Sequence, residues 1–167
     1  MSKYVLLRAH QKCRSKLTDA VVEVADATDN RALCGWAFEL KQKDIIRQAL
    51  EANCSRIFRM TVVNNSKLTF SPQSEANFDG KTIREEVVSG SVVWCTKCNQ
   101  ALFDVAFYFD KTLVTLQFTV ADHHDLNLKY MWTLRSALMA KNVNITRLVH
   151  LGIVEKVAGH FRKPKSW

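Results

Sequence analysis

Hydrophobic positions recur along the chain with two periods, and the longer period predicts three helices. A repeat near 3.6 residues, the period of an α-helix, runs through residues 15–25, 32–53 and 125–141. Asn30 and Asp125 stand at the start of the second and third helices, where a short polar side chain accepts hydrogen bonds from the free amides of the first turn. The apolar stripe expected along the third helix consists of Leu128, Met131, Leu134 and Leu138.

The shorter period, in which apolar and polar residues alternate, predicts strands. The expected strands span residues 56–63, 67–70, 91–94, 103–109, 113–120 and 146–154. Turn-forming residues fill the stretch 71–80, which is therefore interpreted as a loop. The last strand is continuous and apolar enough to be central in a sheet, and a further helix is expected after it.

The order of these elements predicts the fold class. Helices and strands follow one another in a way that favours an α/β or α+β fold with a single mixed central sheet flanked by helices. The chain of 167 residues has the length of one domain, and no linker rich in Pro, Gly or Ser divides it. We therefore expect residues 1–167 to form a single domain, with its core at about 33–154 and a basic tail at 159–167.

A hairpin is expected where Asp110 and Lys111 stand between two strands, because a tight turn needs two residues there. Such a turn sets Asp104 directly opposite Gln117, with their Cβ atoms about 4.5–5.5 Å apart. Since side chains alternate between the faces of a strand, Thr119 shares the face of Gln117. The residues expected on the opposite, apolar face are Phe103, Val105, Phe107, Phe109, Val114, Leu116, Phe118 and Val120.

Glu39 is an acidic residue within an apolar stripe of the helix at 32–53. It precedes Ile46 and Leu50 by spacings that are each within about 20° of a whole number of helical turns. Because burying an unpaired charge is costly, Glu39 needs a partner, and a metal cation shared with Asp104 would supply one. Each of these polar residues also fits an ordinary solvent-facing position, so the hypothesis rests on their joint arrangement.

The charge of the chain adds a preference for anionic partners. Lys and Arg number 24 against 16 Asp and Glu, which gives a formal net charge of +8. This balance favours DNA as the partner, with RNA or a protein as alternatives. No apolar run reaches the roughly 18 residues of a membrane span, and no signal peptide is predicted. The basic residues expected to hold phosphates are Lys41, Lys43, Arg47, Arg135 and Lys141.

The cysteines bear on the compartment. There are five, at irregular spacing, so we expect reduced thiols and an intracellular site of action rather than a disulfide framework. Cys95 and Cys98 form a single CxxC pair, and structural zinc is not expected there because no second pair accompanies it.

Several of these residues together form a pattern that resembles a known nuclease-like family. The pattern consists of Gly35-Trp-Ala-Phe-Glu39 on a helix, Phe103-Asp104 at the start of a strand, Leu116-Gln-Phe-Thr-Val120 on the next strand, and His124 before a Leu-rich helix. It resembles the restriction-endonuclease-like domain, of the PD-(D/E)xK superfamily, that occurs in crinkler effectors and retrotransposon hot spot proteins. The resemblance covers roughly residues 33–154.

This resemblance implies a core of helix, three-stranded meander, helix and strand. It also implies a site that holds Mg²⁺ or Mn²⁺ and activates water for the hydrolysis of a phosphodiester. By position in the motif, Glu39 and Asp104 would be metal-binding acids, Gln117 would stand in the E position and Thr119 in the K position of E-x-K.

Two departures from the motif leave two functions open. Gln117 is a neutral ligand, and Thr119 cannot replace a lysine that stabilises developing negative charge. Lys129 would then have to supply the lysine, and His124 or His123 the base. The first hypothesis is a Mg²⁺-dependent nuclease acting on DNA. The alternative is a catalytically inactive module of the same fold that binds nucleic acid or a protein partner.

The resemblance also bears on context. Proteins of this family usually carry an NTPase module ahead of the nuclease-like domain, and no GxxxxGK[ST] motif occurs in this chain. We therefore expect a stand-alone relative or an excised domain. The resemblance implies action in the nucleus, which would be the host nucleus for an effector.

Overall fold

The computed structural model describes residues 15–28, 30–51, 58–61, 67–96, 103–119 and 128–154, together with the helical residues 6, 9, 10, 12 and 13. Several expectations fall outside these described residues. They concern Cys98, Val120, His123, His124, Asp125, the tail at 159–167 and a helix after residue 154.

Two helices in the first third of the chain pack along each other. α2 spans Ser15–Thr28 and α3 spans Arg31–Glu51, so both predicted helices are confirmed. Asn30 caps α3 as expected, because its Oδ1 accepts hydrogen bonds from the amides of Ala32 and Leu33 at 3.0 and 3.3 Å. The residues buried around this helix pair are Leu6, Val21, Ala25, Ala37 and Leu40.

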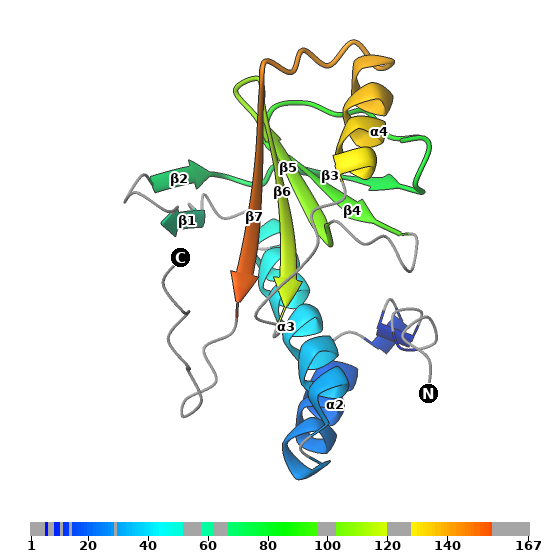
Figure 1. Cartoon of the computed structure of the whole chain (residues 1–167), viewed down its shortest axis with the longest axis vertical. Helices are drawn as coiled ribbons and strands as arrows, with labels where there is room; N and C mark the ends of the chain where they lie inside the picture. The colour runs from blue at the N-terminus through cyan, green and yellow to red at the C-terminus, as the bar shows by residue number, and fades with distance from the viewer. Residues whose placement is uncertain are drawn as a thin grey trace, which may run out of the picture.

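Five strands form one mixed sheet in the order β3-β4-β5-β6-β7 (Figure 1). β4, β5 and β6 form an antiparallel meander, whereas β3 is parallel to β4 and β7 is parallel to β6. The expected mixed sheet with accompanying helices is thus confirmed. The strands span Ser74–Phe78 (β3), Ser91–Cys95 (β4), Val105–Phe109 (β5), Thr112–Thr119 (β6) and Arg147–Val154 (β7).

A separate antiparallel pair precedes this sheet. β1 spans Phe58–Thr61 and β2 spans Lys67–Phe70, and the pairing joins Phe58 to Phe70. Both strands are thus confirmed at the positions that the sequence predicts.

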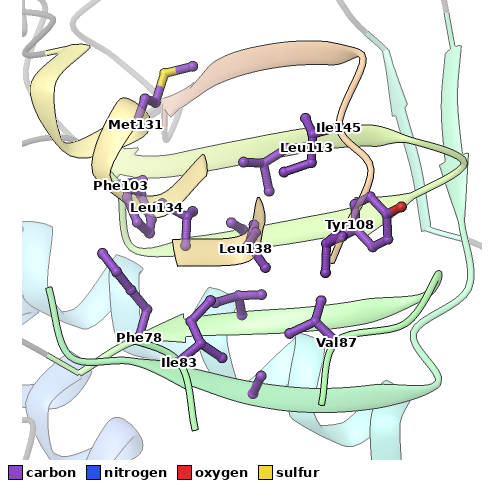
Figure 2. Close-up of a cluster of buried hydrophobic side chains, with 14 residues drawn as sticks. Phe78, Ile83, Val87, Phe103, Tyr108, Leu113, Met131, Leu134, Leu138 and Ile145 are labelled. Carbon is purple, nitrogen blue, oxygen red and sulfur yellow. The ribbon is translucent and has the colours of Figure 1, made fainter. Parts of the chain in front are cut away.

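One face of the five-stranded sheet is covered by α4, which spans Leu128–Met139 and connects β6 to β7. Figure 2 shows Leu134 and Leu138 of this helix lying over the strands beside Leu113. Both leucines are fully buried, as the apolar spacing predicts. Leu128 is an exception, because it is 47% exposed at the start of the helix and does not face the sheet.

The other face of the sheet is covered by α3. Phe38 and Ile46 of this helix pack with apolar residues of β4, β5 and β6, and the ring of Phe38 meets that of Phe118 edge-on at 6.1 Å. In Figure 1, α3 passes along the sheet and continues beyond it beside α2. The sheet is therefore a middle layer between α3 and α4.

β3 corrects the prediction of a loop at 71–80. Ala76 and Phe78 of this strand are buried, while Glu75 and Asn77 are exposed. The strand lies at the edge of the sheet, so only one of its faces needs apolar residues. Its polar half and the neighbouring Ser-Pro and Asp-Gly dipeptides gave it the composition of a loop.

β7 corrects the prediction of a central last strand, because it is the other edge of the sheet. Its side chains alternate between two clusters, with Leu148 packed on the α4 side and Val149, Leu151 and Ile153 on the α3 side. A strand covered on both faces carries apolar residues on both sides even at an edge. The apolar residues of β7 therefore reflect the clusters on the two faces of the sheet, not a strand on each side.

Candidate functional site

The hairpin that was expected to assemble the site has the predicted register. Phe109 pairs with Thr112 and Val105 with Leu116, around a turn at Asp110 and Lys111. Both turn residues have positive φ, 42° and 58°, which is the geometry of a type I′ turn. This turn matches the right-handed twist of the strands, and it fixes which residues of β5 and β6 oppose each other.

Asp104 lies immediately before β5 and ends its ladder with β6. Its amide donates to the Leu116 carbonyl at 2.7 Å, and its Oδ2 accepts a hydrogen bond from the Phe118 amide at 2.8 Å. In a continued ladder the Phe118 amide would donate to the carbonyl of residue 103. The carboxylate therefore replaces a backbone acceptor at the point where the strands part, and its partner Phe118 stands between Gln117 and Thr119 in the chain.

A bend at Asp104 also changes the expected face of Phe103. Phe103 packs under α4, with its ring centroid 6.2 Å from that of Phe78, whereas Val105 packs on the α3 side. The prediction that Phe103 and Val105 share a face is wrong, because regular strand geometry begins only at Val105.

Gln117 and Thr119 project from the α4 side of β6. The alternation along the strand places them with Leu113 and Thr115, opposite Leu116 and Phe118, which pack toward α3. Thr119 is buried and Gln117 is half-buried. Their neighbour Thr115 lies with its Oγ1 at 2.9 Å from Nδ1 of His150 on β7, so this side of β6 carries a row of polar groups.

Glu39 lies on the other side of the sheet, on α3. It is 4% exposed, and its Oε1 is 2.5 Å from the Nζ of Lys43, which is 7% exposed. The burial of Glu39 confirms that it belongs to the helix stripe of Ile46 and Leu50, both of which pack against the α3-side cluster. Lys43, one turn along the same helix, supplies the charge partner that a buried carboxylate requires.

A second polar group continues this arrangement along α3. Asp44 accepts a hydrogen bond from Thr18 of α2 at 2.6 Å, and its other oxygen lies 2.8 Å from Nε2 of His10. That contact is short, but Nε2 has no aligned hydrogen-bond acceptor among the described residues. Arg47 Nη1 lies 3.4 Å from Nδ1 of His10, so Nδ1 is the acceptor and the ring proton is on Nε2.

Burial decides the charge state of His10, which is only 2% exposed. Its removal from water lowers its pKa below the usual 6.5, although the neighbouring Asp44 carboxylate acts in the opposite direction. The imidazole is therefore neutral at physiological pH. It meets the Arg47 guanidinium through Nδ1 as a neutral acceptor, not as a cation.

Arg47 links this network to an open cavity at the β3 edge of the sheet. Its guanidinium stacks over the Trp94 ring at 4.8 Å, and the indole Nε1 of Trp94 donates to Glu75 at 3.0 Å. The cavity has a volume of about 390 Å³ and is lined by residues of α3, β3 and β4, including Arg47, Glu75, Asn77 and Trp94. Its lining carries both charge signs and selects neither anions nor cations.

The residues expected to hold Mg²⁺ do not share one face of the sheet. Glu39 lies on the α3 side and is paired with Lys43, whereas Gln117 and Thr119 project from the α4 side. Among the described residues, no group of three or more His, Cys, Asp and Glu side chains could hold a metal ion. The sheet thus separates Glu39 from Gln117 and Thr119, and a metal centre shared by these residues stays a prediction.

The basic residues expected to hold phosphates, and Lys129, which was expected to supply the catalytic lysine, differ in their surroundings. Lys43 and Arg47 are engaged inside the protein, by Glu39 and by Trp94 respectively. Lys41, Lys129 and Lys141 are exposed, although Lys141 also donates to the Arg84 carbonyl at 2.8 Å. Arg135 of α4 lies over the ring of exposed Trp132 at 5.7 Å.

Sequence reasoning missed the polar network on α3 although part of its signal was visible. Glu39, Lys43 and Arg47 are spaced at four-residue intervals, which places them on neighbouring turns of one helix face. That spacing predicts an intrahelical partner for Glu39 before any distant one. His10 and Thr18 gave no comparable signal, because their contacts with Asp44 depend on how α2 and the N-terminal residues fold back on α3.

Comparisons of the chain with known proteins identify no family. No protein-family model, curated protein or solved structure matches the chain. None of the helices in the described part of the chain is long and apolar enough to cross a membrane.

Proposed function

We propose that this chain is a DNA-binding module on a nuclease-like core. Apart from β1, β2 and β3, which stand between α3 and β4, the elements α3, β4, β5, β6, α4 and β7 follow in the order helix, antiparallel three-stranded meander, helix and parallel strand. This is the order that the resemblance to restriction-endonuclease-like domains implies. The agreement supports the proposed core, since a chance match of short motifs does not require this topology.

The observation that carries DNA binding is the charge of one continuous segment. No Asp or Glu occurs between Leu128 and Val154, where the basic residues are Lys129, Arg135, Lys141 and Arg147. Lys129, Lys141 and Arg147 are exposed. The segment formed by α4, β7 and their connection is therefore positively charged and contains no acidic residue. Phosphates are the complementary partner of such a segment.

The contacts of the Glu39 and Asp104 carboxylates favour DNA binding without hydrolysis. Lys43 already compensates Glu39, and the Asp104 carboxylate accepts the Phe118 amide at the end of the hairpin. Both acids thus have partners within the protein that explain their positions. A phosphate-binding surface needs neither of them.

Salt-dependent binding to a labelled DNA duplex tests this proposal. Electrostatic binding lowers the logarithm of the association constant by about 0.9 per phosphate contact for each tenfold increase in salt. Arg147→Glu should weaken binding and flatten this dependence. Lys16→Glu, a charge reversal at an exposed position of α2, is the matched control and should have the smaller effect. Absence of duplex binding at low salt, or equal losses in both variants, would contradict the proposal.

Metal-dependent hydrolysis of DNA is the second candidate, and one contact favours it. The hairpin register brings the Asp104 carboxylate to the Phe118 amide, between Gln117 and Thr119 of the expected motif. Plasmid nicking with Mg²⁺ or Mn²⁺ separates the two functions. Asp104→Asn retains an oxygen for the Phe118 amide but removes the charge. Nicking by the wild type that this variant loses would establish hydrolysis, whereas no nicking by the wild type supports binding alone.

A further inference from the structure

α4 carries a second line of residues that does not face the sheet. This line begins at Leu128 and continues four, seven and eleven positions later with Trp132, Arg135 and Met139. At 100° per residue, these four positions lie within about 60° of one another around the helix. We call these four residues the outer stripe of α4. The buried line of the same helix consists of Met131, Leu134 and Leu138.

The outer stripe is apolar and exposed. Leu128 is 47%, Trp132 53% and Met139 48% exposed, and these are three of the six exposed large apolar side chains among the described residues. Trp is usually well buried, so an indole with half of its surface in solvent is unusual. A cluster of such side chains on one helix indicates a surface that contacts a partner.

The Trp132 ring is held in a defined way. The Arg135 guanidinium, one turn further along α4, lies 5.7 Å from the ring centroid, which is within the range of a cation–π contact. This contact occupies one side of the indole and leaves an exposed part to a planar ligand. The pair offers a flat aromatic surface directly beside a positive charge.

The surrounding charges select the partner. Lys129 precedes Trp132 by three positions on α4, Lys141 follows Met139 by two positions, and both are exposed. A second copy of this stripe would bring like charges together, which opposes self-association. Aromatic rings that stack on bases, next to cations that hold the phosphates, are the usual means of binding single-stranded nucleic acid. In a duplex the base faces are stacked on each other and are closed to the indole.

We propose that the outer stripe of α4 binds single-stranded DNA, with an unpaired base stacked on Trp132 and phosphates held by the neighbouring cations. This inference rests on the proposed DNA binding and adds the form of DNA that is recognised. It assigns Trp132 as the residue that distinguishes unpaired from paired bases. Arg135 orients the ring and contributes positive charge.

Anisotropy of labelled DNA tests the inference with three variants. Loss of one base–aromatic stack weakens binding by about 5- to 150-fold, so Trp132→Ala should weaken single-strand binding by that factor and duplex binding much less. Trp132→Phe keeps an aromatic face and should restore most of the affinity. Ile45→Ala truncates another exposed apolar residue, 43% exposed on α3, and should change nothing.

The outcomes separate this inference from the proposed function. Duplex binding with no effect of Trp132→Ala on single strands would overturn the role of the stripe and leave DNA binding intact. Absence of binding to both forms would overturn both proposals. A third outcome would assign the stripe to a membrane surface instead. In that case the wild type binds vesicles containing phosphatidylserine and does not bind single strands, and Trp132→Ala loses the vesicle binding. An RNA oligonucleotide that binds more tightly than DNA of the same sequence would overturn the choice of DNA.

Discussion

The buried Glu39–Lys43 pair leads to a stability prediction that separates a structural role from metal binding. Both side chains are almost completely buried, at 4% and 7% exposed. Replacing Glu39 by Met leaves the Lys43 ammonium buried without its partner, and removing one member of such a pair costs about 3–5 kcal/mol. Since native domains are stable by only about 5–15 kcal/mol, this loss is a large fraction of the whole.

The magnitude can be checked by a double-mutant cycle. Glu39→Met and Lys43→Met should each destabilise the protein by about 3–5 kcal/mol, which lowers the melting temperature by roughly 6–20 °C. The double variant places two apolar side chains of similar length at the same sites, and such replacements of a buried pair are often neutral or stabilising. Urea denaturation followed by circular dichroism, with and without Mg²⁺, measures all four proteins.

A different result would refute the reasoning. If Glu39 acted as a metal ligand, the Glu39→Met variant would be at least as stable as the wild type without metal. Mg²⁺ would then stabilise the wild type and not the variant, because a ligand stabilises only a protein that binds it. Additive losses in the double variant would show that the two side chains are not coupled.

Three further predictions concern the core, the titrating groups and the hairpin turn. Leu134→Ala, on the buried face of α4, should destabilise the protein by about 2–5 kcal/mol in urea denaturation; a loss below 1 kcal/mol would contradict its burial. Burial lowers the pKa of His10 and of His150, so the unfolded chain binds protons more readily and the free energy of unfolding should fall as pH decreases from about 7.5 to about 5. His10→Gln should reduce this slope, and a stability that rises on acidification would refute the assignment. Lys111→Gly relieves a side chain from positive φ in the turn with Asp110, and it should raise stability by up to about 1 kcal/mol, whereas Lys111→Val should lower it.

Features set by neighbouring residues were predictable from the sequence. Asn30 caps α3 because its side chain reaches amides two and three residues ahead. Asp110 and Lys111 define the turn, and with it the entire register of β5 and β6. These structures depend on contacts within a few residues, which a sequence displays directly.

Features set by distant segments were not predictable. Whether β7 is central or at an edge depends on which strands lie beside it, and its apolar residues reported only that helices cover both faces. The partner of Glu39 was misjudged for a different reason. A distant cation was sought, although Lys43 was one helical turn away. Whether Gln117 and Glu39 lie on the same face of the sheet depends on where α3 and α4 pack, and the sequence does not show this.

The parallel pairing of β6 with β7 has a consequence for synthesis of the chain on the ribosome. Thr115 and His150, which meet across these strands, are 35 residues apart in sequence, whereas the β5–β6 hairpin closes locally. A hairpin forms in about 1–10 μs, but translation of 35 residues takes about 2–7 s. For those seconds the outer backbone of β6 has no strand to pair with, so the nascent chain presents an edge that chaperones or other nascent chains can bind.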